Sequence, residues 1–330
     1  MTHGASIDRL SPPWWLQGGH SQTLFRKFSP TESVKQKRER IELDDRDFID
    51  LDWSADAPTG HEASETIVFI LHGLCGCSGS SYIQSLQALL SKQGVSSVVM
   101  NFRGCSGEVN RKAKAYHSGA SEDVNEVFTK FSTKYPSKNF VCIGFSLGAN
   151  VMLKWLGEIG EHRRISKAAA VSTPFSLKYC SQAMLSGPSR IYGKYFVWRL
   201  VKELQTKLAV FEANRFEEEL ELLKSLGDFS SVKTLWEFDE AVTAPLNGFK
   251  HAEDYYHRCS SDKFLSAINT ETLLIQSKND PLIPPESVPA AQFLRSNIHL
   301  HLEDTGGHVG FFDGQREKWL ENQLMRYLLD

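Results

Sequence analysis

The sequence has no surplus of basic residues and no long apolar run. Its 37 Lys and Arg are outnumbered by 40 Asp and Glu, so the net charge of −3 leaves no excess positive charge to bind a phosphate backbone, and nucleic acid is not an expected partner. No apolar run approaches the ~20 residues that cross a bilayer, and residues 1–19 lack the basic start, apolar core and cleavage site of a secretory signal. We therefore expect a soluble, cytoplasmic protein without an integral membrane span.

Cysteine is also scarce, with six residues dispersed along a chain of 330. A chain of this length can bury a hydrophobic core without covalent cross-links, so the sequence predicts free thiols and no disulfide framework. Cys75 and Cys77 are close enough to suggest a metal or redox site, but no second Cys/His pair stands at ligand spacing. We expect neither a metal nor another cofactor.

Short apolar runs alternate with helical periodicity along most of the chain. Residues 37–43 and 48–53 alternate apolar and polar side chains around an Asp-rich turn, which predicts an antiparallel hairpin. The later runs are continuous and rich in β-branched residues, as in strands covered on both faces. They predict strands at 66–71, 95–100, 139–144, 167–172, 272–277 and 297–303. The helical patterns lie near 80–93, 121–134 and 147–160, from 285 onwards, and at 316–329.

The alternation stops between residue 174 and about residue 262, where helical signals follow one another with no strand between them. Alternating strands and helices predict an α/β fold, a mostly parallel sheet with helices on both faces. The uninterrupted helical stretch predicts an inserted cap. We expect a single domain made of an N-terminal arm and hairpin (1–55), a core (60–173 and 263–330) and a helical cap (about 174–262).

Ser146 stands between two glycines, Gly144 and Gly148, where an apolar run gives way to a helical pattern. By average residue usage a G-x-S-x-G pattern arises ~0.1 times by chance in a chain of this length, so its context matters more than the match. A sharp strand-to-helix turn would hold the serine in a strained conformation with its hydroxyl above the sheet, and glycines would remove colliding side chains. The alternative is a structural Gly-Ser turn at a helix start.

Asp280 and His308 complete a candidate catalytic set. A serine hydroxyl is a weak nucleophile that needs a histidine base, and the histidine needs a carboxylate to fix its tautomer. Asp280 follows the predicted strand 272–277 and His308 follows 297–303, beyond the carboxyl ends of strands, where open α/β sheets build their sites. The alternatives are an Asn-Asp-Pro turn for Asp280 and an ordinary loop histidine for His308.

A candidate oxyanion hole follows the predicted strand 66–71, in the stretch His72-Gly73-Leu74. The tetrahedral intermediate of acyl transfer needs N–H donors. Serine hydrolases whose catalytic residues follow the chain order Ser, acid, His draw one donor from such a loop and one from the residue after the nucleophile. We expect the backbone amides of Leu74 and Leu147 to be these donors. Losing one such donor typically costs ~3 kcal/mol of transition-state stabilisation.

A metal site is the competing interpretation of the histidines near the carboxyl end. His299, His301, Asp304 and His308 can be drawn as a metal cluster. However, His299 and His301 share one face of a predicted strand, where a histidine is more often packed or solvated than a ligand. We therefore expect no metal.

With these residues identified, the chain resembles the α/β-hydrolase superfamily and, within it, the YheT-like branch of predicted carboxylesterases. The stretches that carry the resemblance are PPWWLQGGHSQTL (12–24), LHGLCGCSGS (71–80), NFRGCSGEVNR (101–111), YHSGASEDV (116–124), GFSLGAN (144–150) and GGHVGF (306–311). The resemblance implies an α/β-hydrolase fold and hydrolysis of carboxylic esters, with medium-chain acyl esters or acylglycerols as substrates of some relatives. One departure is Asn279, where relatives often carry a second aspartate, and it leaves Asp280 as the acid of that turn.

We expect a serine carboxylesterase acting on a small-molecule ester, of short- to medium-chain acyl type or an acylglycerol. Ser146 would attack the carbonyl, His308 would take and return the proton, Asp280 would orient His308, and water would complete the cycle. An acyltransferase that passes the acyl group to an alcohol stays open. A non-catalytic binding protein on the same fold would be expected to have lost one of the three residues.

The predicted cap carries an apolar stripe at near-helical spacing, formed by Tyr195, Phe196, Trp198, Val201, Leu204 and Leu208. The stripe would wall an acyl pocket or simply pack against the core, and its lack of polar anchors favours an apolar acyl group. The roles of His117 and Arg103 stay open. Trp14 and Trp15 would pack an N-terminal arm against the core, with transient contact with a lipid surface as the alternative.

Overall fold

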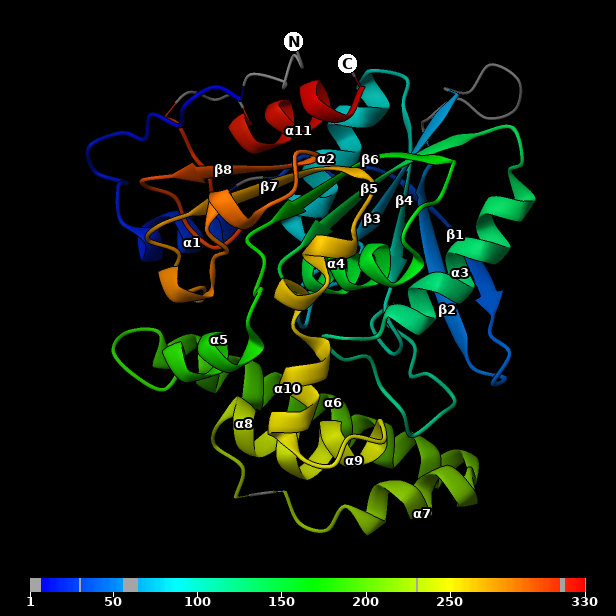
Figure 1. Ribbon diagram of the computed structural model, residues 1–330. Helices are drawn as coiled ribbons and strands as arrows, with labels where there is room; N and C mark the ends of the chain where they lie inside the picture. The colour runs from blue at the N-terminus through cyan, green and yellow to red at the C-terminus, as the bar shows by residue number, and fades with distance from the viewer. Residues whose placement is uncertain (1–6, 30, 56–64, 230, 315–317, 330) are drawn as a thin grey trace.

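The computed structural model describes residues 7–29, 31–55, 65–229, 231–314 and 318–329. Eight strands form one sheet in the order β1-β2-β4-β3-β5-β6-β7-β8 (Figure 1). The strands are β1 (Gln36–Glu42), β2 (Phe48–Ser54), β3 (Thr66–Leu71), β4 (Ser96–Asn101), β5 (Asn139–Phe145), β6 (Ile165–Val171), β7 (Glu271–Ser277) and β8 (Ile298–Glu303). β2 is antiparallel to both of its neighbours, β1 and β4, and all other pairs are parallel. The predicted α/β-hydrolase sheet and its N-terminal hairpin are confirmed.

Helices cover both faces of this sheet, because each parallel connection must cross over a face to reach the next strand. The helices of the core are α1 (Gly19–Phe28), α2 (Ser81–Lys92), α3 (Ser121–Lys134), α4 (Leu147–Ile159) and α11 (Trp319–Leu329). Figure 1 shows α3 and α4 on one face and α2 and α11 on the other. Phe128 and Trp155 belong to the apolar cluster under the first pair, and Leu86 and Leu324 to the cluster under the second.

The predicted helix from residue 285 onwards is wrong. Only two short 3-10 turns occur there, Pro285–Ser287 and Ala291–Phe293. Pro289 cannot donate a helical hydrogen bond, and it forces the residue before it, Val288, into an extended conformation with ψ near 127°. The predicted start of the core at residue 60 and of the last helix at residue 316 lie outside the described residues.

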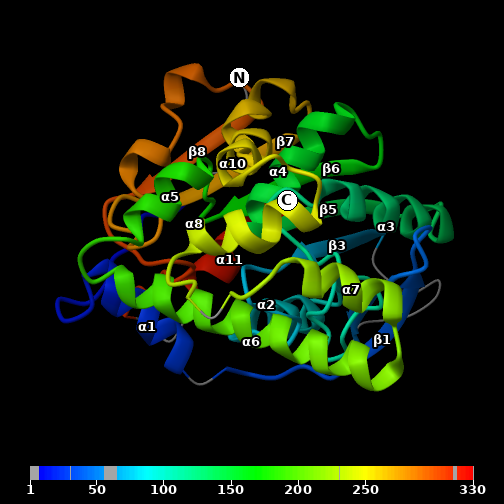
Figure 2. The same cartoon turned by 90° about the horizontal axis from the view of Figure 1, so that it is seen from below.

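Between β6 and β7 the described residues form helices and no strand. The elements are α5 (Leu177–Ala183), α6 (Arg190–Asn214), α7 (Glu217–Ser225), α8 (Leu235–Phe238), a π-helix (Asp239–Thr243), α9 (Ala244–Leu246), α10 (Ala252–Cys259) and the 3-10 turns Ser261–Lys263 and Leu265–Ala267. Seen from below, α6 runs across the molecule (Figure 2). These helices share an apolar cluster of their own, separate from the clusters on the sheet. Its buried members include Leu204, Phe211, Leu223 and Phe238.

Candidate active site

Ser146 occupies a strained turn between β5 and α4. Its φ is 51° and its ψ is −121°, a conformation that costs a non-glycine residue ~1–3 kcal/mol and is common at functional sites. A methyl group on Gly144 would overlap the backbone of Ala149, and one on Gly148 would overlap the backbone of His72. The two glycines are therefore required by close backbone approach on both sides of the serine.

The structure brings the side chains of Ser146, His308 and Asp280 together. His308 Nε2 lies 2.7 Å from Ser146 Oγ, and His308 Nδ1 lies 3.0 Å from Asp280 Oδ2. An ionised carboxylate only accepts hydrogen bonds, so Nδ1 carries the proton and Nε2 is free to accept the hydroxyl proton of Ser146. The Asp280 side chain is fully buried and that of His308 is 12% exposed, so the serine lies at the accessible end of the chain of bonds.

The turn after β7 gives Asp280 a second task. Its Oδ1 accepts hydrogen bonds from the backbone N–H groups of Leu282 and Ile283, at 2.8 and 3.2 Å. The sequence analysis gave an Asn-Asp-Pro turn as the alternative for Asp280. These two hydrogen bonds show that Asp280 stabilises that turn in addition to contacting His308. The same bonds hold the carboxylate still beneath the His308 ring.

The loop after β3 lies directly against the serine. The Gly73 backbone approaches Ser146 so closely that a methyl group on Gly73 would lie 3.2 Å from Ser146 Cβ. The hydroxyls of Tyr82 and Tyr116 accept hydrogen bonds from the N–H groups of Gly73 and Cys75, on either side of Leu74. Leu74 itself lines the cavity next to Ser146.

His72 fixes the start of this loop. Its Nδ1 donates to Gly73 O at 2.8 Å, and its Nε2 accepts from Phe102 N–H at 3.1 Å. Complete burial lowers the pKa of His72 to about 4, so the ring is neutral and can make both bonds at once. On the other side of Ser146, Leu147 is the first residue of α4, where backbone N–H groups have no intrahelical acceptor.

The sequence did not predict helix α1, which braces the loop that carries His308. Thr23 Oγ1 accepts a hydrogen bond from His308 N–H at 2.8 Å, and Gln22 Oε1 accepts one from Phe312 N–H at 2.8 Å. Methyl groups on Gly307 or Gly310 would collide with the backbone of α1. Close packing of α1 therefore requires these glycines. The available signal was the stretch PPWWLQGGHSQTL (12–24), which contributed to the family resemblance but predicted no helix.

Thr23→Val is expected to lower kcat by about 10-fold with little change in KM, because the His308 N–H loses its partly buried acceptor and the loop shifts. Initial rates over a range of ester concentrations measure the two constants separately. Thr23→Ser keeps the acceptor and should restore kcat to within a factor of about 2 of wild type. An unchanged kcat in the valine variant would contradict a positioning role for Thr23.

The residues of the alternative metal cluster bind other partners. His299 Nε2 lies 2.5 Å from Glu271 Oε1, and His301 Nε2 lies 2.6 Å from Glu303 Oε1. Asp304 pairs with Lys278. His308 faces Ser146 and Asp280. Within the described ranges no group of three or more His, Cys, Asp or Glu is arranged to hold a metal ion.

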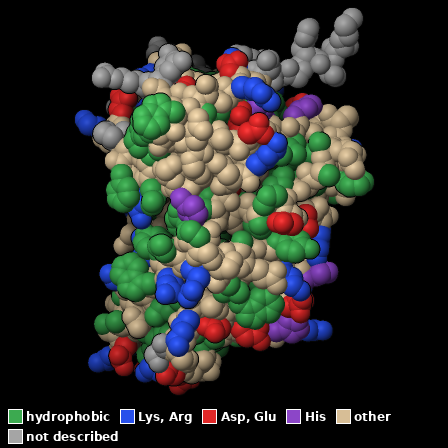
Figure 3. All heavy atoms as spheres, turned by 90° about the vertical axis from the view of Figure 1, so that its left-hand side faces the viewer, with side chains coloured by type: hydrophobic (Ala, Val, Ile, Leu, Met, Phe, Trp, Pro, Cys, Tyr) green, Lys and Arg blue, Asp and Glu red, His purple; other side chains and the backbone are tan. Residues whose placement is uncertain are grey.

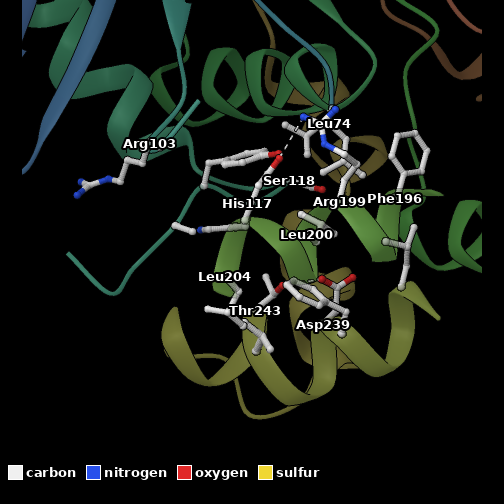
Figure 4. A pocket seen from close by; sticks show the side chains of 18 of the residues that line it. Leu74, Arg103, His117, Ser118, Phe196, Arg199, Leu200, Leu204, Asp239 and Thr243 are labelled. Atoms are coloured by element: carbon white, nitrogen blue, oxygen red, sulfur yellow. Dashed lines mark hydrogen bonds and ion pairs between the residues drawn. The ribbon is translucent and has the colours of Figure 1, made fainter. Parts of the chain in front are cut away.

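A cavity of about 510 Å³ lies between the sheet and the helices α5, α6, α8, α9 and α10 (Figure 4), within the size range of small-molecule sites. Leu74, Ser146, Leu147 and His308 line it from the sheet side. Of the predicted apolar stripe, only Phe196, Trp198 and Leu204 reach it.

The remaining wall corrects a second expectation. Val201 and Leu208 pack among the helices between β6 and β7 and do not reach the cavity. Polar side chains also line the cavity, including Arg199, Glu203 and Asp239. The expectation of a wall without polar anchors is therefore wrong. Besides the apolar stripe, α6 and the π-helix also contribute polar residues to the cavity wall.

The guanidinium group of Arg103 is occupied by ion pairs within the fold. Its side chain is 3% exposed and forms ion pairs with Asp45, Asp47 and Asp123 at 2.7 to 2.8 Å. These contacts tie the hairpin turn to α3. Figure 4 shows its guanidinium turned away from the cavity, even though Arg103 contributes to the cavity wall.

His117 does reach the cavity. Its side chain is buried, its Nδ1 accepts from Gly119 N–H at 3.1 Å, and its Nε2 lies 3.8 Å from Glu122. Burial lowers the pKa of His117, so the ring is neutral at pH 7. No described contact joins His117 to Ser146.

The predicted packing of the tryptophan arm is wrong for Trp14, which is 86% exposed. Trp15 is 52% exposed and touches Phe25 edge-on. Figure 3 shows hydrophobic side chains on the face that carries α1 and α5 in Figure 1. Contact of this arm with a lipid surface stays a prediction. Among the described residues no helix combines the length and apolar character needed to cross a bilayer.

Comparison with known proteins identifies the family of this chain. The sequence model of the family described as alpha/beta hydrolase fold matches residues 66–315. The chain is 34% identical over 313 residues to the predicted esterase YheT of Escherichia coli (strain K12), covering 94% of this chain and 89% of that protein. It is 31% identical over 283 residues to the monoacylglycerol lipase of Saccharomyces cerevisiae, covering 84% of this chain and 62% of the yeast protein.

More distant similarity extends to a phospholipase and to solved structures. Phospholipase ABHD3 of Bos taurus is 28% identical over 308 residues, covering 92% of this chain and 73% of that protein. The structure of the Pyrococcus furiosus esterase Pf2001 superimposes with a TM-score of 0.55 at 18% identity, covering 98% of this chain and 100% of that one. At this identity the structural likeness shows the shared fold alone.

Proposed function

The chain belongs to the α/β-hydrolase fold family and, within it, to the YheT-like esterases, and from this premise we propose that it is a serine carboxylesterase that works through Ser146, His308 and Asp280. It is a hydrolase acting on ester bonds, as its fold and its esterase and lipase relatives indicate. The observation that carries the proposal is the 2.7 Å contact of His308 Nε2 with the Ser146 hydroxyl, with His308 Nδ1 on a buried carboxylate.

The reaction would run in two halves. Ser146 Oγ attacks the ester carbonyl carbon while its proton passes to His308 Nε2, and the resulting imidazolium gives that proton to the departing alkoxide. The acyl group is then held as an ester of Ser146. Water attacks this acyl-enzyme, its proton passing to His308, and the proton returns to Ser146 Oγ as the carboxylic acid leaves. Asp280 stays ionised and stabilises the imidazolium in both halves.

We assign the oxyanion hole to the backbone amides of Leu74 and Leu147. The Leu147 amide is at the positive end of α4, and Leu74 sits between two N–H groups already bound to tyrosine hydroxyls. Both residues line the cavity beside Ser146. N–H donors held in place in this way would stabilise the negative charge of the transition state without having to move. This preorganisation is the usual source of most of their contribution to catalysis.

Short- to medium-chain acyl esters or acylglycerols are the proposed substrates. Leu74, Phe196, Leu200 and Leu204 give the cavity an apolar wall that suits an acyl chain. The name of the yeast relative, monoacylglycerol lipase, favours an acylglycerol. In this proposal the chain is one α/β-hydrolase domain, and the helices of about 174–262 are its cap over the acyl site.

Covalent labelling tests the proposal. A fluorophosphonate probe should modify the wild-type protein once, and peptide mapping by mass spectrometry should locate the adduct on Ser146. Ser146→Ala should remain unlabelled. Ser118→Ala is a matched control, since Ser118 lines the same cavity, and it should be labelled as fast as wild type. An adduct on another residue, or an equally labelled alanine variant, would refute the assignment.

A further inference from the structure

A carboxylate in the cap faces the cavity from the side opposite the serine. Asp239 begins the π-helix Asp239–Thr243 and contributes to the cavity wall. Figure 4 shows Asp239 and Thr243 on the cap side and Leu74 on the sheet side, across the cavity. A group bound at Asp239 would therefore be remote from the ester carbonyl.

This carboxylate has unused hydrogen-bonding capacity. Oδ1 accepts from Thr243 Oγ1 at 2.7 Å and Oδ2 accepts from the Tyr256 hydroxyl at 2.6 Å. A carboxylate offers about four acceptor positions, so about two are left. Burial raises the pKa of Asp239 to about 6, but the group is still mostly ionised at pH 7. Within the described residues no Lys, Arg or His forms an ion pair with it.

A second acceptor lies two turns further along the same segment. Asn247 also lines the cavity, and its Oδ1 is buried without a hydrogen-bond partner. The Asn247 side-chain N–H donates to Thr243 O at 2.8 Å, and flipping the amide would set two oxygens against each other, so this orientation is fixed. An unpaired buried acceptor is costly unless something donates to it.

Resting on the proposed esterase function, we infer that Asp239 and Asn247 form a subsite that binds a hydroxyl group of the substrate, remote from the scissile ester. Two acceptors with free capacity call for a donor. The donor is a neutral hydroxyl and not an ammonium group, because Lys202 and Lys207 already bring positive charge to the cavity wall in addition to the Arg199–Glu203 ion pair. The enzyme would thus select hydroxylated esters over plain alkyl esters.

Three matched ester pairs test this subsite. Monooctanoylglycerol against propyl octanoate places the hydroxyl on the alcohol side, and methyl omega-hydroxyoctanoate against methyl nonanoate places it on the acyl side. We expect wild-type kcat/KM to favour the hydroxylated member of one pair by about 10-fold or more, because a hydrogen bond to a charged group has that effect. The favoured pair identifies the side. Octanoylcholine against dimethylbutyl octanoate tests a cation instead.

Asp239→Asn is expected to reduce the hydroxyl preference to less than about 3-fold, while fluorophosphonate labels Ser146 at the wild-type rate. Glu203→Gln is the matched control, a second carboxyl in the cavity wall held by Arg199, and should keep the full preference. Should Asp239→Asn fail to fold, Asn247→Ala provides the same test and should reduce the preference about 3-fold.

Three outcomes would overturn the subsite. They are a wild type with no preference in either hydroxyl pair, a preference that survives both substitutions, and a choline preference that disappears in Asp239→Asn. A wild type that neither reacts with fluorophosphonate nor hydrolyses any of the esters would instead refute the proposed esterase function, so the two failures are distinguishable.

Discussion

Replacing Ser146 by alanine is expected to lower kcat for ester hydrolysis by about 10⁴- to 10⁶-fold, since the variant has no nucleophile to form the acyl-enzyme. The remaining rate would come from binding and from the amides of Leu74 and Leu147, which can still stabilise direct attack by water. The measurement is kcat at saturating ester, with fluorophosphonate titration of active sites to exclude contaminating hydrolases. A loss of less than about 10-fold would contradict Ser146 as the nucleophile.

The strained backbone of Ser146 provides the control for misfolding. With φ at 51°, this position favours glycine, so Ser146→Gly should be at least as stable to heat as wild type. It should nevertheless be as inactive as Ser146→Ala. Loss of activity with no loss of melting temperature would assign the effect to the missing hydroxyl. A strong destabilisation by glycine would contradict the strain.

Asp280→Asn is expected to lower kcat by about 10⁴-fold. The amide would present an N–H to His308 Nδ1, favouring the tautomer that puts the proton on Nε2, where it cannot accept from Ser146. The side-chain oxygen that accepts from Leu282 and Ile283 is retained, so the turn should still fold. Steady-state kinetics and a thermal melt of the same preparation separate these two effects.

Asn279→Asp is the matched control for this turn. Asn279 Oδ1 accepts from Gly306 N–H at 2.9 Å, and a carboxylate can make the same bond; only the exposed hydrogen bond from Asn279 Nδ2 to Gln17 O is lost. We expect kcat within about 3-fold of wild type, since the side chain at position 279 does not contact the His308 ring. Equal and large losses in Asn279→Asp and Asp280→Asn would show that the turn tolerates no change, and would withdraw the specific role of Asp280.

The helices between β6 and β7 were predicted only in part. A long helical stretch without strands predicted the helices themselves, but not the polar side chains that line the cavity. Asp239, Thr243 and Asn247 stand four residues apart, a spacing that places them on one side of the helical segment, and hydrogen bonds link each to the next. Tyr256 reaches Asp239 from α10, and no local pattern in the sequence predicts that contact. The wrong prediction of a helix after Pro285 has a local cause. Pro289 prevents a helix there, although the surrounding residues show a helical pattern.

By itself the sequence determined the order and type of nearly all core strands and helices, because burial on both faces of a strand and on one side of a helix leaves a periodic pattern. It also singled out Ser146, Asp280 and His308, because turn glycines and the carboxyl ends of strands are readable locally. Only the tertiary structure decided that α1 supports the His308 loop and that polar acceptors line the cavity. Those depend on long-range packing, which no local pattern records.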